Sequence, residues 1–114
     1  MEIVGEEYRV LHDPAEAAVT FQGTLRLSGL VDYAPIKQLM DDIVTAGPEK
    51  VVLDVRRLEF LNSSGIVLLF KFVINLHDLT TGQVVIYGST SYPWQTRWLN
   101  DLKRLVPELH LTMD

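Results

Sequence analysis

Two adjacent serines lie where a strand pattern changes to a helix pattern. An apolar, strand-forming run at residues 51–55 is interrupted only by Asp54, and after a charged segment the sequence Asn62-Ser63-Ser64-Gly65 precedes a long apolar run. A helix start carries unpaired backbone N–H groups and a partial positive charge, both of which stabilise an anion. The serine hydroxyls are therefore placed where a phosphate group would be stabilised.

The same residues have two other interpretations. The first is simple helix capping, because Asn and Ser are favoured N-cap residues that contribute about 1 kcal/mol each; on these residues alone, capping is preferred. The second is nucleophilic catalysis, which requires a histidine base close to the serine. His77 lies roughly 21 Å away along the expected helix, and the chain has no Gly-x-Ser-x-Gly, P-loop or His-x-x-x-His motif. We therefore expect a protein that is not an enzyme and that holds no cofactor or metal.

The motif resembles the signature of the STAS domain of bacterial anti-sigma-factor antagonists. That signature is an apolar strand ending in Asp, about six residues, and then Asp-Ser-Ser-Gly at a helix start; the matching residues here are Asp54 and Asn62-Ser63-Ser64-Gly65. Asn62 replaces the family's aspartate, and Val67 stands where many members have a second glycine. The resemblance and the element pattern imply one STAS-like α/β domain over residues 1–114, with a mixed, mainly parallel sheet of about five strands and helices chiefly on one face.

In such antagonists a partner anti-sigma kinase phosphorylates the first serine of the pair. The resemblance therefore implies phosphorylation of Ser63, with Ser64 less favoured, by a serine kinase of the histidine-kinase-like ATPase class, and reversal by a serine phosphatase. The unphosphorylated protein would bind the kinase or anti-sigma factor and so release a sigma factor. The alternative is a STAS-like module that binds a small anion at the Ser63 helix end, or that serves as an unmodified scaffold.

An apolar side chain is expected to lie exposed beside the serines. The polar positions of the helix expected at residues 66–79 form one narrow stripe through Lys71. Extended back toward Ser64, this stripe passes through Val67 or Leu68. Such a residue is either an ordinary surface hydrophobe or a contact for a protein partner.

Two arginines precede the serines in a segment that is expected to be a loop, residues 56–64. Arg56 and Arg57 could pair with a phosphate on Ser63 or with an acidic partner, and they could equally be solvated charges balanced by Glu59. Asp54 is expected to be satisfied by backbone N–H groups of this segment. The residues expected at the partner surface are Asp32, Arg56, Arg57, Asn62, Ser63, Ser64, Val67, Leu68, Lys71 and Tyr92.

The rest of the chain supplies the elements that position this motif. Apolar residues at every second position from 19 to 27 predict a strand with one wet face, and shorter runs predict strands at 8–12, 51–55, 84–87 and 109–113. Helical periodicity predicts helices at 33–46, capped by Asp32, at 66–79, ended by Gly82, and at 94–106. Tyr92 precedes the last helix, where it either packs locally or contacts a partner. Right-handed crossovers should bring the loops after the parallel strands to one edge of the sheet.

Composition restricts the classes of partner. A net charge of -5 argues against a direct nucleic-acid partner, and the absence of cysteine excludes disulfides and is compatible with the cytoplasm. The apolar run at 66–76 would span only roughly 16 Å as a helix, which is too short to cross a membrane. No secretory signal is recognisable, so we expect a cytoplasmic protein.

Family members often carry a further C-terminal helix, and without it an open sheet edge could pair with a second copy to give a homodimer.

Overall fold

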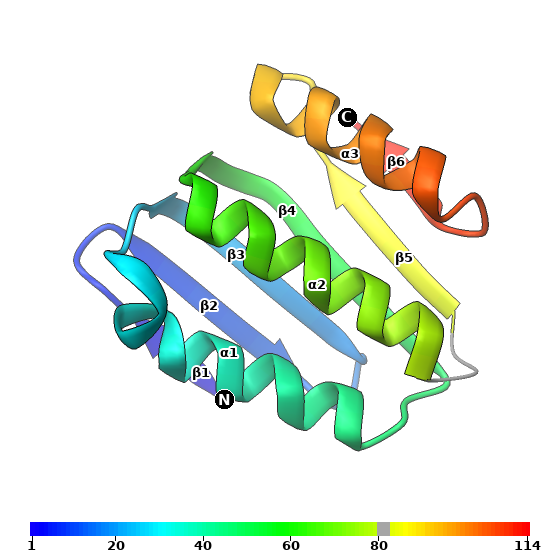
Figure 1. Cartoon of the computed structure of the whole chain (residues 1–114), viewed down its shortest axis with the longest axis horizontal. Coiled ribbons are helices and arrows are strands. Elements are labelled where there is room, and N and C mark those ends of the chain that lie inside the picture. Colours follow the sequence, from blue (N-terminus) through cyan, green and yellow to red (C-terminus); the bar gives the residue numbers. More distant parts are fainter. Residues whose placement is uncertain (80–82) are drawn as a thin grey trace.

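The computed structural model describes residues 1–79 and 83–114 of the chain (Figure 1). Its elements in chain order are β1 (Glu2–Val4), β2 (Tyr8–Asp13), β3 (Ala18–Leu25), α1 (Gly29–Thr45), β4 (Lys50–Leu61), α2 (Ser63–Leu79), β5 (Gln83–Gly88), α3 (Pro93–Leu105) and β6 (His110–Met113). Gly82, which was expected to end α2, lies outside the described residues.

All of these strands form one sheet, in the order β1-β2-β3-β4-β5-β6. The pairs β1–β2 and β2–β3 are antiparallel, whereas β3, β4, β5 and β6 are parallel to one another. Each parallel strand is reached through one helix and always adds to the same side of the sheet, so right-handed crossovers place α1, α2 and α3 on one face (Figure 1). The predicted mixed, mainly parallel sheet with helices on one face is confirmed. The sheet has six strands where about five were expected.

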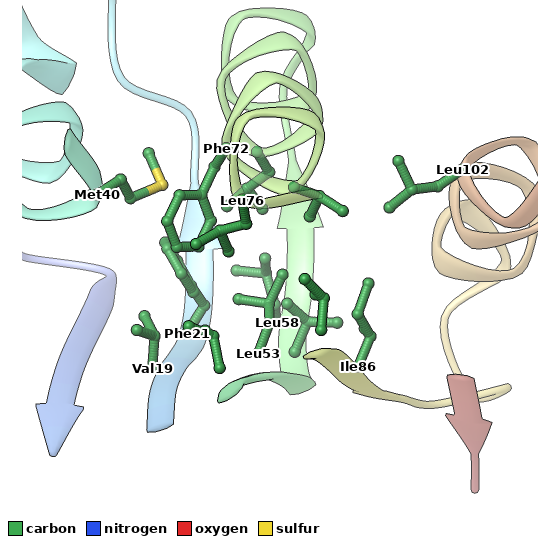
Figure 2. Packing of buried hydrophobic residues seen from close by; sticks show 14 of the residues in the cluster. Val19, Phe21, Met40, Leu53, Leu58, Phe72, Leu76, Ile86 and Leu102 are labelled. Carbon is green, nitrogen blue, oxygen red and sulfur yellow. The ribbon is translucent and has the colours of Figure 1, made fainter. Parts of the chain in front are cut away.

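The core fills the space between the sheet and the three helices (Figure 2). Side chains from the central strands meet side chains from the inner faces of the helices, and each residue labelled in Figure 2 is at most 3% exposed. These residues are Val19, Phe21, Met40, Leu53, Leu58, Phe72, Leu76, Ile86 and Leu102. Removing this apolar surface from water is the main stabilising contribution to the fold. No helix within the described residues has both the length and the apolar character needed to span a bilayer.

The prediction of a loop at residues 56–64 is wrong, because β4 continues as a strand to Leu61. Buried residues occur at every second position up to Val55 and then at Leu58 and Leu61, three residues apart. The change of spacing coincides with two register shifts in the pairing with β3. Such irregularities leave extra residues on one strand, so the period of two is lost in the sequence although the strand continues.

Two further expectations are corrected at the ends of elements. The predicted cap Asp32 lies inside the first turn of α1, because this helix begins at Gly29 with Ser28 at the N-cap position. Its first turn carries the apolar residues Leu30 and Val31, which are exposed to solvent. Because they do not fit the apolar stripe of the helix, hydrophobic periodicity did not reveal where the helix begins. The strand β1 was not predicted. It is short and lies at the edge of the sheet, where it pairs with β2 alone.

Candidate partner-binding site at the start of α2

Asn62 joins three segments of the chain at the start of α2. Its Oδ1 accepts hydrogen bonds from the backbone N–H of Gly65, at 3.0 Å, and from the Tyr33 hydroxyl, at 2.7 Å. Its Nδ2 donates to the Leu27 carbonyl at 2.9 Å. The first contact is the usual N-cap bond of a helix, while the other two attach α1 and the segment before it to the same side chain. Capping, one of the three sequence interpretations, is therefore correct for Asn62.

Gly65 allows this close approach of α1 and α2. It is buried, and a Cβ at this position would lie 2.3 Å from Cδ1 of Leu61 and 2.7 Å from the Tyr33 hydroxyl oxygen. Both distances are shorter than van der Waals contact. The glycine of the Asn-Ser-Ser-Gly motif is thus required by packing, since any side chain would displace the hydroxyl that bonds to Asn62.

Ser63 and Ser64 are the first two residues of α2, and both side chains are exposed to solvent. Among the described residues neither hydroxyl makes a hydrogen bond. Their hydroxyls stand at the electropositive end of a helix of 17 residues. A group attached to either oxygen would enter solvent without disturbing the Asn62 cap, because the cap uses a different side chain.

Exposed apolar side chains occur near the starts of both α2 and α1. Val67 is 52% exposed, so the predicted exposed residue beside the serines is confirmed, while Leu68 is only partly exposed. Leu30 and Val31 are 76% and 84% exposed. They lie between Leu27 and Tyr33 in the chain, and both of those residues bond to Asn62. We call Leu30, Val31, Ser63, Ser64 and Val67 the α1–α2 surface.

Sequence reasoning missed Leu30 and Val31. The available signal was that both precede the apolar stripe of their helix, whose buried positions begin at Tyr33. Two apolar residues outside the stripe of an amphipathic helix face solvent. Asp32 is exposed beside them, so it lies in the same turn as the apolar pair even though it does not cap the helix.

A groove lies between α1 and α2, and its lining includes Leu68, the residue that follows Val67. It encloses about 200 Å³, and Leu68, Lys71 and Asn75 of α2 face Lys37, Met40, Asp41 and Val44 of α1 across it, with Phe72 completing the lining. Lys37 and Asp41 form an ion pair at 2.6 Å within the groove. Lys71 forms no ion pair among the described residues. The structure therefore brings Leu68 and Lys71 together along one line that leads to Ser64.

The two arginines of the predicted site lie elsewhere. Arg56 forms an ion pair with Asp54 at 2.8 Å and lies over the ring of Tyr87 at 5.3 Å. Asp54 and Arg56 alternate with buried Val55 along β4, so they occupy the sheet face opposite the helices. Arg57 lines a polar hollow with both of them. The structure does not bring these arginines to Ser63, and the expectation that they flank it from a loop is corrected.

Arg56 donates hydrogen bonds to the Asp54 carboxylate from both its backbone and its side chain. The carboxylate accepts a bond from the Arg56 backbone N–H at 3.0 Å and two bonds from the Arg56 guanidinium, at 3.1 and 2.8 Å. Burial raises the pKa of Asp54, but the hydrogen bonds and charge of Arg56, helped by Arg57, outweigh burial and lower the pKa below its usual value. The sequence predicted that backbone N–H groups would donate hydrogen bonds to the Asp54 carboxylate. The Arg56 backbone does donate one, but the other two come from the Arg56 guanidinium.

Gln95 is a buried residue that the sequence did not single out. Pairing of β4 with β5 ends at Asp54, so the following carbonyls of β4 have no partner strand on that side. Gln95 replaces the strand: its Nε2 donates to the carbonyls of Val55 and Leu58, at 2.6 and 2.9 Å, and its Oε1 accepts from the Ser89 N–H. A glutamine in the first turn of a helix is usually solvated, so no sequence signal marks it.

Tyr92 immediately precedes α3 and is partly buried. Its neighbour Trp94 donates from Nε1 to the Glu59 carbonyl at 3.0 Å, and the rings of Trp94 and Trp98 pack with centroids 6.0 Å apart. Trp94 therefore braces the last residues of β4, which directly precede Asn62 and the serines of α2. Within residues 1–79 and 83–114 no group of three or more metal-ligating side chains is close enough to hold an ion.

Comparison with solved structures identifies the fold. SiaC of Pseudomonas aeruginosa superposes with a TM-score of 0.75 at 15% identity, over 100% of this chain and 98% of that chain. An anti-sigma factor antagonist from Mycobacterium paratuberculosis superposes with a TM-score of 0.68 at 20% identity, over 95% of this chain and 87% of that chain. The fold is STAS-like. The fold implied by the motif is therefore confirmed.

A third structure shows a similar chain in an assembly. A chain in the complex of the diguanylate cyclase SiaD with its activator SiaC, from Pseudomonas aeruginosa, superposes with a TM-score of 0.74 at 13% identity, over 99% of this chain and 97% of that chain. In sequence, no protein-family model and no curated protein matches this chain. At these identities the likeness concerns the fold.

Proposed function

We propose that this protein is a regulatory module that binds another protein through the α1–α2 surface and that is switched by phosphorylation of Ser63. The observation that carries the proposal is an exposed hydroxyl at the first position of α2, one helical turn from the exposed side chain of Val67, while Leu30 and Val31 are exposed on the first turn of α1. Exposed apolar patches of this kind are typical of protein interaction sites. The protein itself would catalyse no reaction and need no cofactor.

The physical basis of the switch is electrostatic. A phosphate on Ser63 would add about -1.5 to -2 charges and three acceptor oxygens. The positive end of α2 would stabilise this charge, and the exposed position means that the fold need not rearrange. A partner that buries Val67 would have to desolvate the phosphate beside it, and this cost would weaken binding.

The partner class follows from the motif and from the likeness to an anti-sigma factor antagonist. We propose a cytoplasmic circuit in which a serine kinase of the histidine-kinase-like ATPase class, acting as the anti-sigma factor, both phosphorylates Ser63 and binds the unphosphorylated protein. A serine phosphatase would reverse the modification. The protein would supply only the acceptor hydroxyl, and Ser64 is the less favoured acceptor.

A second candidate partner is an enzyme that the module activates, as SiaC activates the diguanylate cyclase SiaD. The observation that favours it is the extent of the superposition, because this chain covers 97% to 98% of the SiaC-like chains and 87% of the antagonist. In both cases the protein acts by binding at the same surface. The two partner classes are distinguished by which purified protein binds it.

The switch is tested with Ser63 variants and a purified serine kinase of the histidine-kinase-like ATPase class from the same organism. We expect Ser63→Ala to abolish transfer of labelled phosphate from ATP while it keeps binding, and Ser63→Glu to weaken binding at least tenfold. Ser64→Ala is the matched control and should behave as the unaltered protein. Labelling that persists in Ser63→Ala, together with normal binding of Ser63→Glu, would contradict the switch. An unaltered protein that takes up no label would instead favour an unmodified scaffold or, if a small anion copurifies, an anion-binding module.

The surface is tested by placing a charge on it. Val67→Glu should weaken partner binding by at least tenfold, because the carboxylate would be buried without a partner in the complex. Val4→Glu is the matched control, since Val4 is also exposed, at 62%, but lies on β1 at the edge of the sheet. Equal binding by the two variants would place the interface elsewhere.

A further inference from the structure

A cavity lies at the opposite end of α1 from the serines. It encloses about 330 Å³ between the last turns of α1, the turn that joins β2 to β3, and the start of β4. Its apolar lining combines the edges of four core side chains that are only 1% to 6% exposed, Val19, Leu39, Ile43 and Val51, with the more exposed Met1, Ala17 and Ala46. Hydrocarbon that lines a hollow open to water is less favourable than the same hydrocarbon in contact with an apolar ligand.

The charges around the cavity are balanced in sign. Lys50 and the amino group of Met1 are positive, and the latter donates to the His12 carbonyl at 3.0 Å. Asp42 is negative and accepts a bond from the Gln38 amide at 2.8 Å. The C-terminal end of α1, where Ala46 lines the cavity, contributes partial negative charge. A charged ligand group of either sign would therefore meet both a like and an opposite charge, so the cavity favours neither sign.

His12 does not alter this balance near neutral pH. Its side chain is partly buried, and desolvation followed by the nearby amino-terminal charge lowers the pKa of His12, while Asp13 raises it to a lesser extent. The imidazole is thus mainly uncharged at pH 7. It adds a polar group to the lining of the cavity without adding net charge.

We propose that this cavity is a binding site for a small uncharged molecule with an apolar chain or ring and one polar group. At roughly 30 Å³ per non-hydrogen atom, its volume suits a ligand of about ten such atoms. The apolar part would contact Leu39, Ile43 and Val51, and the polar group would remain at the mouth. The proposal is independent of the regulatory function, because the cavity and the α1–α2 surface are at opposite ends of α1.

The test titrates 1-octanol, octanoate and octylamine into the full chain and follows backbone amide signals by NMR. We expect octanol to shift the signals of His12, Ala46 and Lys50 saturably, with a dissociation constant of about 1 mM or lower. Octanoate and octylamine should each bind more weakly than octanol. Shortening octanol to hexanol should weaken binding about tenfold, because two buried methylene groups are lost.

Two matched variants locate the site. Ala46 and Ala34 are both exposed residues of the α1 region, but only Ala46 lines the cavity. Ala46→Phe should fill the cavity and weaken octanol binding at least tenfold, whereas Ala34→Phe should leave it within about twofold of the unaltered protein. Absence of saturable binding, or equal binding by the two variants, would overturn the site. Tighter binding of octanoate or octylamine than of octanol would overturn the assignment to an uncharged ligand.

Discussion

Asn62 shows how one side chain can do more than cap a helix. Its Oδ1 accepts hydrogen bonds from the Gly65 backbone N–H of α2 and from the Tyr33 hydroxyl, and its Nδ2 donates to the Leu27 carbonyl. An aspartate could accept the first two bonds but could not donate the third. The amide at this position, where the related signature has a carboxylate, is therefore explained by the contact with Leu27.

We expect Asn62→Asp to destabilise the protein by about 1 kcal/mol at pH 7. The carboxylate would face the Leu27 carbonyl without a proton to share, which costs about 1–3 kcal/mol. The start of α2 offsets about 0.3–1 kcal/mol of this, because it favours negative charge. Urea unfolding of the variant, with Ser64→Ala as the control, measures the difference. An increase in stability would show that the helix start outweighs the lost bond.

A second prediction concerns Arg56, which pairs with Asp54. Because the folded pKa of Asp54 is lowered, the pair stabilises the protein above the unfolded pKa of aspartate, about 3.9, and this stability is lost as the pH falls through the folded pKa. Since the pair is partly exposed, Arg56→Gln should cost about 0.5–1 kcal/mol at pH 7. The cost should shrink steadily below about pH 4.

Unfolding by urea at a series of pH values measures this dependence. Arg104→Gln is a suitable control, because Arg104 is exposed and its contact with Asp101 is long, at 3.8 Å. We expect no measurable effect of that control at any pH. A cost of Arg56→Gln that stays constant down to pH 2 would mean that the arginine acts through packing on Tyr87 and not through the carboxylate.

Among the elements, β4 matters most for the position of the serines. It extends beyond the end of β5 and delivers Asn62 to the start of α2, so its last residues lack a strand on one side. Gln95 and Trp94 of α3 supply hydrogen bonds to that side. The third helix therefore acts as a brace for β4, in addition to covering the sheet.

This brace predicts a large effect for Gln95→Leu. Two carbonyls and one N–H would be left without partners in a buried place, and we expect a loss of about 3 kcal/mol of stability. Gln38→Leu is the matched control; Gln38 is exposed on α1, and the change should be within about 0.5 kcal/mol. Urea unfolding compares the two. Equal stabilities would show that water replaces the amide of Gln95.

At the scale of the whole molecule, the two ends of α1 serve different purposes. The carboxyl edge of the parallel strands carries the α1–α2 surface, and the opposite edge carries the cavity. One core connects them, since all three helices pack on the same sheet face. We therefore expect both ends of α1 to belong to one cooperative unit.

This arrangement predicts two-state unfolding. Both tryptophans, Trp94 and Trp98, lie on α3 at one side of the sheet, whereas far-ultraviolet circular dichroism reports the whole chain. If α3 and β6 unfold together with the other elements, urea transitions followed by tryptophan fluorescence and by circular dichroism will coincide. A fluorescence transition at lower urea would show that α3 and β6 form a separate, weaker unit.

Local pattern was sufficient for much of the fold. Alternation of apolar residues identified β3 and β6, and a short apolar run identified β5, each to within about two residues. Helical periodicity identified α3 to within one residue and α2 with its start three residues too late. The motif at Asn62 was enough to place exposed serines at a helix start, and the stripe through Lys71 was enough to expose Val67. Each of these features depends on residues that are close in sequence.

The tertiary structure alone decided the rest. The continuation of β4 past Arg56, the buried role of Gln95 and the separation of the arginines from Ser63 all depend on where neighbouring strands end and which sheet face is covered. The exposure of Leu30 and the cavity beside Ala46 depend on which distant segments pack against the two ends of α1. Contacts between residues that are distant in sequence decide these features. The periodicity of apolar residues reports only the local secondary structure, so it cannot predict them.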